Sequence, residues 1–172
     1  MQKRHTDRES YFGEQSQTSK NYYIPYIKEV IGHIPDKVLE VGCGEGGNLL
    51  PFAEAGCRVM GVDIDATRIE QARTFFAQRH QQGQFIATDI FQLEDKATNF
   101  PLILLHDVIE HIRDKERFLS GLQKHLSADG AIFVGFPAWQ MPFGGHQQIA
   151  HSHIVSHFPF LHHLVAKTFS ED

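Results

Sequence analysis

The sequence has few cysteines, no long basic run and no long apolar run. Its two cysteines among 172 residues are too few for the disulfide framework of a small secreted protein. No run of Lys and Arg exceeds two residues and the formal net charge is −5, so the electrostatic footprint of a nucleic-acid-binding protein is missing. No apolar run approaches the roughly 20 residues that span a bilayer, and the first ten residues are polar, without a signal-peptide pattern. We therefore expect a soluble cytoplasmic protein with no membrane span and no nucleic-acid partner.

The chain does have the material for a hydrophobic core. Apolar residues make up 41% of it, with 14 Phe and 4 Tyr, and a chain of this length forms one domain by the usual prior. We expect a single domain over residues 1–172. Its expected parts are a mobile arm over residues 1–20, a core over residues 21–136, and a substrate-side loop with C-terminal helices over residues 137–172.

Short apolar segments alternate with helical patterns through the core. The expected strands are residues 38–42, 58–63, 84–88, 102–106 and 131–136. The expected helices are residues 21–34, 48–55 and 66–82, and one that Asp114 caps and Asp129-Gly130 ends. Strands that are apolar throughout and alternate with helices indicate a parallel sheet covered on both faces. The fold class is therefore α/β, with a doubly wound, Rossmann-like sheet.

A glycine-rich segment follows the first expected strand. It reads Val38-Leu39-Glu40-Val41-Gly42-Cys43-Gly44-Glu45-Gly46-Gly47. Gly42 and Gly44 let the backbone approach a ligand, because glycine has no Cβ to hold the ligand away. Asp63 ends the next strand, 21 residues after Gly42, which is about where a βαβ nucleotide-binding unit places the carboxylate that holds a ribose.

Ligands of such sheets bind beyond the carboxyl ends of the strands. The residues that end the expected strands are Glu40 to Gly44, Asp63-Ile64, Thr88-Asp89-Ile90, His106-Asp107 and Phe136-Pro137. Four of these five ends carry an acid. Acids at successive strand ends suit a ligand that combines a ribose, an adenine and a cationic centre, because a carboxylate attracts a cation in a partly dry site.

Together these residues resemble the class I S-adenosylmethionine-dependent methyltransferases over roughly residues 20–140. The segment Asp107-Val108-Ile109-Glu110-His111-Ile112 is similar to the one after strand four in small-molecule methyltransferases of the ubiquinone-biosynthesis type. The resemblance implies S-adenosylmethionine as the cofactor and strand order 3-2-1-4-5. It also implies the cofactor-binding residues Glu40, Gly42, Cys43, Gly44, Asp63, Ile64, Thr88, Asp89, Ile90 and His106.

The family resemblance assigns these residues to parts of the cofactor. Glu40 and the carbonyl of His106 support the methionine amino group, and the glycines line the methionine portion. Asp63 accepts both ribose hydroxyls. At the adenine end, Ile64 packs on the ring, Asp89 accepts from its amine and the Ile90 backbone flanks it. Cys43 is expected to be a small loop residue and not a nucleophile.

Two other functions remain open. Gly42, Gly44 and Gly47 satisfy the Gly-x-Gly-x-x-Gly pattern of NAD-dependent oxidoreductases. Against this, the acid Glu40 would lie near a pyrophosphate, where a negative charge is unfavourable. The second alternative is a catalytically weak protein that only binds S-adenosylmethionine.

Methyl transfer from a sulfonium depends largely on alignment, and we expect a small-molecule acceptor. If the acceptor is a hydroxyl, a base is useful, and His111, His146 and Asp107 are the candidates. His153 and His157 lie four residues apart, but no clear third ligand accompanies them, so we expect no metal. We also expect residues 11–26 to form a lid over the cofactor.

The 36 residues after Phe136 show helical spacing and no strand alternation. We therefore expect a sheet that lacks the family's C-terminal antiparallel strands. The uncovered edge of strand five would then be covered by the C-terminal helices or by a second copy in a homodimer.

Overall fold

The sheet has five strands in the order β3-β2-β1-β4-β5. The computed structural model describes residues 7–93 and 97–136. The strands are β1 (Lys37–Val41), β2 (Arg58–Asp63), β3 (Gln84–Ala87), β4 (Phe100–His106) and β5 (Leu126–Gly135). All four strand pairings are parallel, so the predicted fold class and strand order are confirmed.

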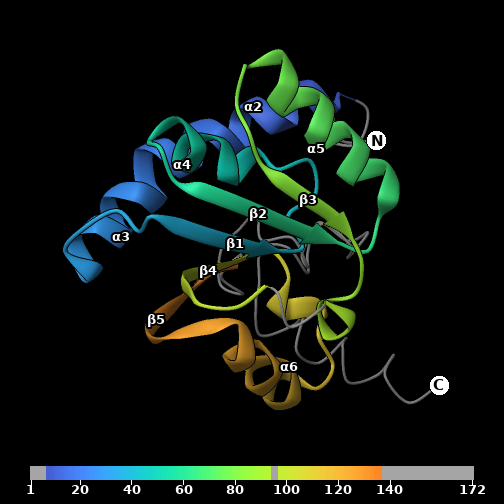
Figure 1. The fold of residues 1–172 in the computed structure, drawn as a ribbon. Helices are drawn as coiled ribbons and strands as arrows, with labels where there is room; N and C mark the ends of the chain where they lie inside the picture. Colours follow the sequence, from blue (N-terminus) through green and yellow to red (C-terminus); the bar gives the residue numbers. More distant parts are fainter. Residues whose placement is uncertain (1–6, 94–96, 137–172) are drawn as a thin grey trace, which may run out of the picture. The chain divides into compact units, whose positions relative to one another are not determined.

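Helices cover the sheet on both faces (Figure 1). Four lie on one face: α2 (Arg8–Thr18), α3 (Ile24–Ile31), α4 (Leu50–Glu54) and α5 (Ala66–Gln78). The other face carries α6 (Lys115–Leu122). A separate buried cluster fills each interface, one around Phe12, Phe52 and Phe76 and the other around Phe118 and Leu122. Alternate residues of β1 belong to these two clusters, as a strand buried on both sides requires.

The N-terminal segment differs from the prediction. Helix α2 begins at Arg8, where the Asp7 side chain accepts a hydrogen bond from the Ser10 amide. It continues through a π-helical turn, η1 (Ser19–Tyr23), into α3. The mobile arm expected over residues 1–20 is therefore wrong from Arg8 onward. The helix is held by Phe12, which is fully buried against Phe75 and Phe76, and one buried aromatic gives too weak a periodicity to recognise in sequence.

Strand β5 also begins earlier than predicted. It starts at Leu126, directly after a short 3-10 helix, η5 (Gln123–His125). The expected helix exit at Asp129-Gly130 instead falls within the strand, at an irregularity where the register shifts. There Phe100 pairs with Leu126 and Leu102 pairs with Ala131. The Asp-Gly pair therefore marks this irregularity and not the end of a helix.

The chain divides into two compact units, residues 1–135 and 136–172. The expected single domain over the whole chain stays a prediction. The expected C-terminal helices, the absence of antiparallel strands and the edge cover all concern residues 137–172, which lie outside the described residues. Within the described ranges, no helix is both long and apolar enough to cross a membrane.

Candidate cofactor-binding site

The glycine loop crosses from the end of β1 over the end of β2. The amides of Gly42 and Cys43 both donate to the carbonyl of Val62, at 2.7 and 3.1 Å. Gly42 has a φ of 73° and Gly44 a φ of 53°, conformations that side-chain-bearing residues rarely adopt. The loop therefore needs glycine at both positions, as the sequence pattern predicted.

Asp63 fixes this loop from the end of β2. Its Oδ2 accepts from the Gly44 amide at 2.8 Å, and its Oδ1 accepts from the Asp65 amide at 2.9 Å. The residue is only 8% exposed. Each carboxylate oxygen has a second lone pair, so Asp63 can also accept from a ligand at the same point. The structure thus brings together Asp63 and Gly44, which the sequence assigned to one ligand.

Glu40 lies on β1 directly beneath the loop and is fully buried. Its Oε1 accepts from the Asn48 side-chain amide at 2.7 Å, but its Oε2 has no hydrogen-bond partner among the described residues. Burial raises the pKa of Glu40 from 4.5 to about 8, and the nearby Asp63 adds to this effect. A buried carboxyl group with one free oxygen is suited to receive a cationic donor.

Asn48 is a part of the site that the sequence did not reveal. It is buried, and its Oδ1 also has no described partner. Its backbone carbonyl accepts from the Ser19 hydroxyl at 2.8 Å. Asn48 therefore links the N-terminal helix to Glu40. No local pattern marks such a residue, because its contacts are to residues 8 and 29 positions away in sequence.

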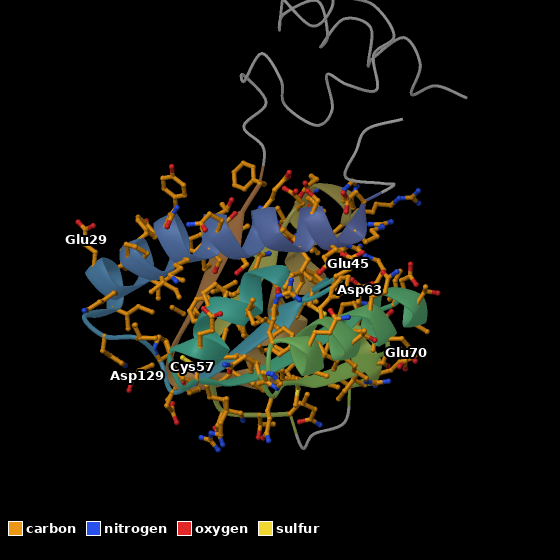
Figure 2. The ribbon with its side chains drawn as sticks, turned by 90° about the horizontal axis from the view of Figure 1, so that it is seen from above. Glu29, Glu45, Cys57, Asp63, Glu70 and Asp129 are labelled. Atoms are coloured by element: carbon orange, nitrogen blue, oxygen red, sulfur yellow. The ribbon has the colours of Figure 1, made fainter. Side chains whose placement is uncertain are left out.

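An ion-pair cluster surrounds Glu45, which is fully buried in the glycine loop (Figure 2). The Arg68 guanidinium of α5 binds both of its oxygens, at 3.2 and 2.9 Å, and Arg8 of α2 approaches to 3.0 Å. Arg68 also comes within 3.9 Å of Asp63 and fills the space that a Cβ on Gly44 would need. The loop is thereby tied to two helices, and no pattern in the sequence predicts this cluster.

At the predicted adenine end, one side chain is exposed and other groups already form hydrogen bonds within the protein. Ile64 is 81% exposed and so is free to pack on a ring. The Thr88 amide donates to the Asp63 carbonyl at 2.9 Å. Asp89 caps a short 3-10 helix, η3 (Ile90–Gln92), through its Oδ1, which accepts from the Phe91 amide at 2.9 Å. Asp89 therefore has a structural role as a cap, which leaves its other oxygen for a ligand.

The segment after β4 closes the opposite side of the loop. Asp107 has a φ of 53°, a left-handed conformation that is uncommon for a non-glycine residue. Its Oδ2 lies 3.8 Å from Nδ1 of His106. Val108 packs closely against Gly42, and a Cβ on Gly42 would collide with the Val108 side chain. His111 ends a further 3-10 helix, η4 (Ile109–His111), and His146 lies outside the described residues.

Burial raises the pKa of the Cys43 thiol well above its usual value. The thiol therefore stays protonated, and the role of a small loop residue fits better than that of a nucleophile. Within residues 7–93 and 97–136, no group of three or more His, Cys, Asp or Glu side chains could hold a metal ion.

The geometry disfavours a dinucleotide site. The third glycine of that pattern, Gly47, permits close helix packing, since a Cβ there would lie 2.7 Å from the Phe12 carbonyl. The loop leads into a three-residue 3-10 helix, η2 (Gly47–Leu49), and not into a long α-helix whose N-terminus could hold a pyrophosphate. The amides of Gly42, Cys43 and Gly44 are also already bonded within the protein.

Sequence comparisons agree with this geometry. The chain is 33% identical over 118 residues to the ubiquinone biosynthesis O-methyltransferase of Bartonella quintana, covering 66% of this chain and 48% of the relative. The corresponding enzyme of Brucella ovis is 34% identical over 98 residues, which is 57% of this chain and 40% of that one. The chain therefore spans about half the length, or less, of these curated relatives.

Solved structures show the same fold. PKMT2 from Rickettsia typhi in complex with AdoHcy has a TM-score of 0.61 and 27% identity, covering 78% of this chain and 30% of that one. The plantazolicin methyltransferase BpumL in complex with a triazolic desmethylPZN analog and SAH has a TM-score of 0.60 and 22% identity, covering 74% of this chain and 48% of that one. The family model described as a methyltransferase domain matches residues 39–132, which include most of β1, all of β2 to β4, the glycine loop and Asp63. This chain belongs to the methyltransferase domain family.

Proposed function

We propose that this protein binds S-adenosylmethionine and transfers its methyl group to a small-molecule acceptor. The observation that carries the proposal is Glu40, whose buried Oε2 has no partner among the described residues while its Oε1 is held by Asn48. The methionine end of the cofactor bears an ammonium, which would supply both the positive charge and the missing hydrogen-bond donor.

At the methionine end, Gly42 and Gly44 would line the ligand because neither has a Cβ that would hold the ligand away from the backbone, and Cys43 lies between them. The carbonyl of His106 would accept from the same ammonium as Glu40. The Asp63 carboxylate would accept the two ribose hydroxyls through the lone pairs that its backbone contacts leave free.

At the adenine end, the exposed side chain of Ile64 would pack on one face of the ring. Asp89 would accept from the exocyclic amine, with Thr88 and the Ile90 backbone beside it. These three residues follow β3, next to β2 in the sheet, so the ring would lie over two adjacent strand ends, as ligands of doubly wound sheets do.

The bound cofactor supplies an electrophilic methyl group, and the residues of this chain orient it for in-line displacement. A hydroxyl acceptor must lose a proton, for which Asp107, His111 and His146 are our candidates. The O-methyltransferase relatives support a small-molecule acceptor. Because this chain spans only about half the length of these relatives, the activity of the whole protein is part of this proposal.

From the composition we also propose a cytoplasmic protein that acts without nucleic acid. β5 pairs with β4 alone among the described strands, and Val134 on it is 37% exposed. A homodimer through this edge is therefore part of the proposal. Sedimentation equilibrium of the full chain would reveal it, and a monomer at all concentrations would exclude it.

Calorimetric titration of the full chain with S-adenosylmethionine, S-adenosylhomocysteine and NAD tests the cofactor assignment. We expect binding of the first two and no binding of NAD. The Glu40→Gln variant should bind S-adenosylmethionine about tenfold or more weakly, because it loses a charge-assisted hydrogen bond. Binding of NAD alone, or of none of the three, would contradict the proposal.

A further inference from the structure

Tyr23 lies beside the candidate site but is not among the predicted cofactor-binding residues. It is the last residue of the π-helical turn Ser19–Tyr23. Its ring packs on His106 at the end of β4, with ring centres 5.6 Å apart, and on Phe133 of β5, with centres 4.9 Å apart. Tyr23 therefore reaches from the N-terminal helix to the strand ends where the ligand is expected.

The turn that carries Tyr23 is anchored to the methionine end of the site. The hydroxyl of Ser19, the first residue of the turn, donates to the backbone of Asn48, and the Asn48 side chain donates to Glu40. A π-helical turn is rare and is frequently found at functional sites. Here it sets the direction of Tyr23 relative to Ser19, so the aromatic ring and Glu40 belong to one connected structure.

The surroundings of the Tyr23 phenol are negative. Burial, and then the charges of Asp107 and Glu40, raise its pKa to about 12. The carboxylate of Asp107, and that of Glu40 when it is ionised, would attract a cation placed beside this ring. Aromatic rings bind cations through their electron-rich faces, and they do so more strongly where water is partly excluded.

We propose that Tyr23 is a cofactor-binding residue that lines the cationic methionine end of the methyl-donor site, together with Glu40 and Asp107. This rests on the proposed function. The methionine end carries two positive centres, an ammonium and a sulfonium, on one short chain. The ring of Tyr23 contributes to binding these centres and not to binding the adenosine portion.

The experiment compares two ligands in the full chain by calorimetry. S-adenosylmethionine carries both cationic groups, whereas 5′-methylthioadenosine keeps the adenosine and the thioether but has neither. Tyr23→Leu removes the ring and Tyr23→Phe keeps it. Tyr22→Leu is the matched control, because Tyr22 belongs to the same turn but is 69% exposed.

We expect Tyr23→Leu to weaken S-adenosylmethionine binding by roughly two- to thirtyfold and to leave 5′-methylthioadenosine binding nearly unchanged. Tyr23→Phe should retain most of the preference for the charged ligand, and Tyr22→Leu should retain all of it. The ratio of the two dissociation constants is the decisive quantity, because partial unfolding of a variant changes both constants equally.

Equal weakening of both ligands by Tyr23→Leu would reduce Tyr23 to a packing residue, and no change in either would remove it from the site. Both results overturn the inference while the proposed function stands. If the wild-type chain binds neither ligand, the proposed function fails and the assignment of Tyr23 fails with it.

Discussion

The carboxylate of Asp63 accepts a hydrogen bond from the amide of Gly44 at 2.8 Å, which joins the end of β2 to the loop that follows β1. This contact spans 19 residues of sequence and places the ribose-binding candidate beside the glycine that lines the methionine portion. One side chain therefore serves both the shape of the loop and the proposed binding of the ligand.

Asp63→Ala should strongly weaken S-adenosylmethionine binding. Two charge-assisted hydrogen bonds to the ribose are at stake, each worth about 1.5–3 kcal/mol, and the loop also loses its anchor. Asp65→Ala is the control, since the Asp65 side chain caps α5 at the amides of Thr67 and Arg68. That variant should lose about 1 kcal/mol of stability but little affinity. An unchanged dissociation constant for Asp63→Ala would exclude it from the site.

Glu40 should make the stability of the ligand-free protein fall as the pH rises. The pKa of Glu40 is about 8 in the folded state, against 4.5 ordinarily. The folded state therefore binds more protons than the unfolded state between these two values, and the free energy of unfolding decreases across this window.

Glu40→Gln removes this titration, so its stability should fall less than that of the wild type between pH 5 and 8. Urea unfolding at both pH values measures the difference. Glu54→Gln, at an exposed position, is the control and should behave as the wild type. Parallel losses in Glu40→Gln and wild type would show that Glu40 does not titrate in this range.

Gly47→Ala and Gly13→Ala should have opposite effects on stability. A Cβ on Gly47 would meet the backbone carbonyl of Phe12 at 2.7 Å, so α2 would have to move away from η2. A Cβ on Gly13, within α2, would meet nothing within 4 Å. That replacement should therefore stabilise the helix by about 0.5–1 kcal/mol. Thermal unfolding of the two variants provides the test, and a stable Gly47→Ala protein would argue against the close packing of α2.

Glu45→Ala should destabilise the fold more than Arg8→Ala. Removing the buried carboxylate takes away the partner that Arg8 and Arg68 share, although Arg68 still has Asp63 at 3.9 Å. Breaking a fully buried ion pair costs about 3–5 kcal/mol, which is therefore the upper limit. Arg8 is 35% exposed, so its loss is screened by water and should cost well under half as much. Denaturant unfolding of the two variants gives the comparison, and equal losses would contradict it.

The helix that carries Tyr23 should become more protected when the cofactor binds. Residues 8–26 include α2 and the π-helical turn, which contact the glycine loop through Arg8 and Ser19. Hydrogen exchange with and without S-adenosylmethionine measures the effect. The exposed end of α3 near Val30, which is 65% exposed, serves as the internal reference. Equal protection of residues 8–26 in both states would rule out the lid expected from the sequence.

Much of the core of the site could be predicted because its signals are local. Strand β2 was predicted with the bounds that the structure has, and Asp65 and Asp114 cap their helices as expected. Gly42, Gly44 and Asp63 follow from the pattern of a strand, a turn and a second strand. Asn48 and Arg68 could not be found this way, because Asn48 is bonded to Ser19 and Arg68 to Glu45, each more than 20 residues away in sequence. Tyr23 falls within the segment 11–26 that the sequence predicts as a lid, which stays a prediction.

The order of the elements and the chemistry at the strand ends follow from the sequence alone. Apolar strands that alternate with helices favour a parallel sheet, and the acids that follow these strands then lie at one edge of the sheet. How the N-terminal helix meets the glycine loop depends on long-range contacts. Phe12 is buried between Phe75 and Phe76, Arg8 and Arg68 share Glu45, and Asn48 joins Ser19 to Glu40. These contacts depend on which surfaces the folded chain brings together, and no local periodicity encodes that choice.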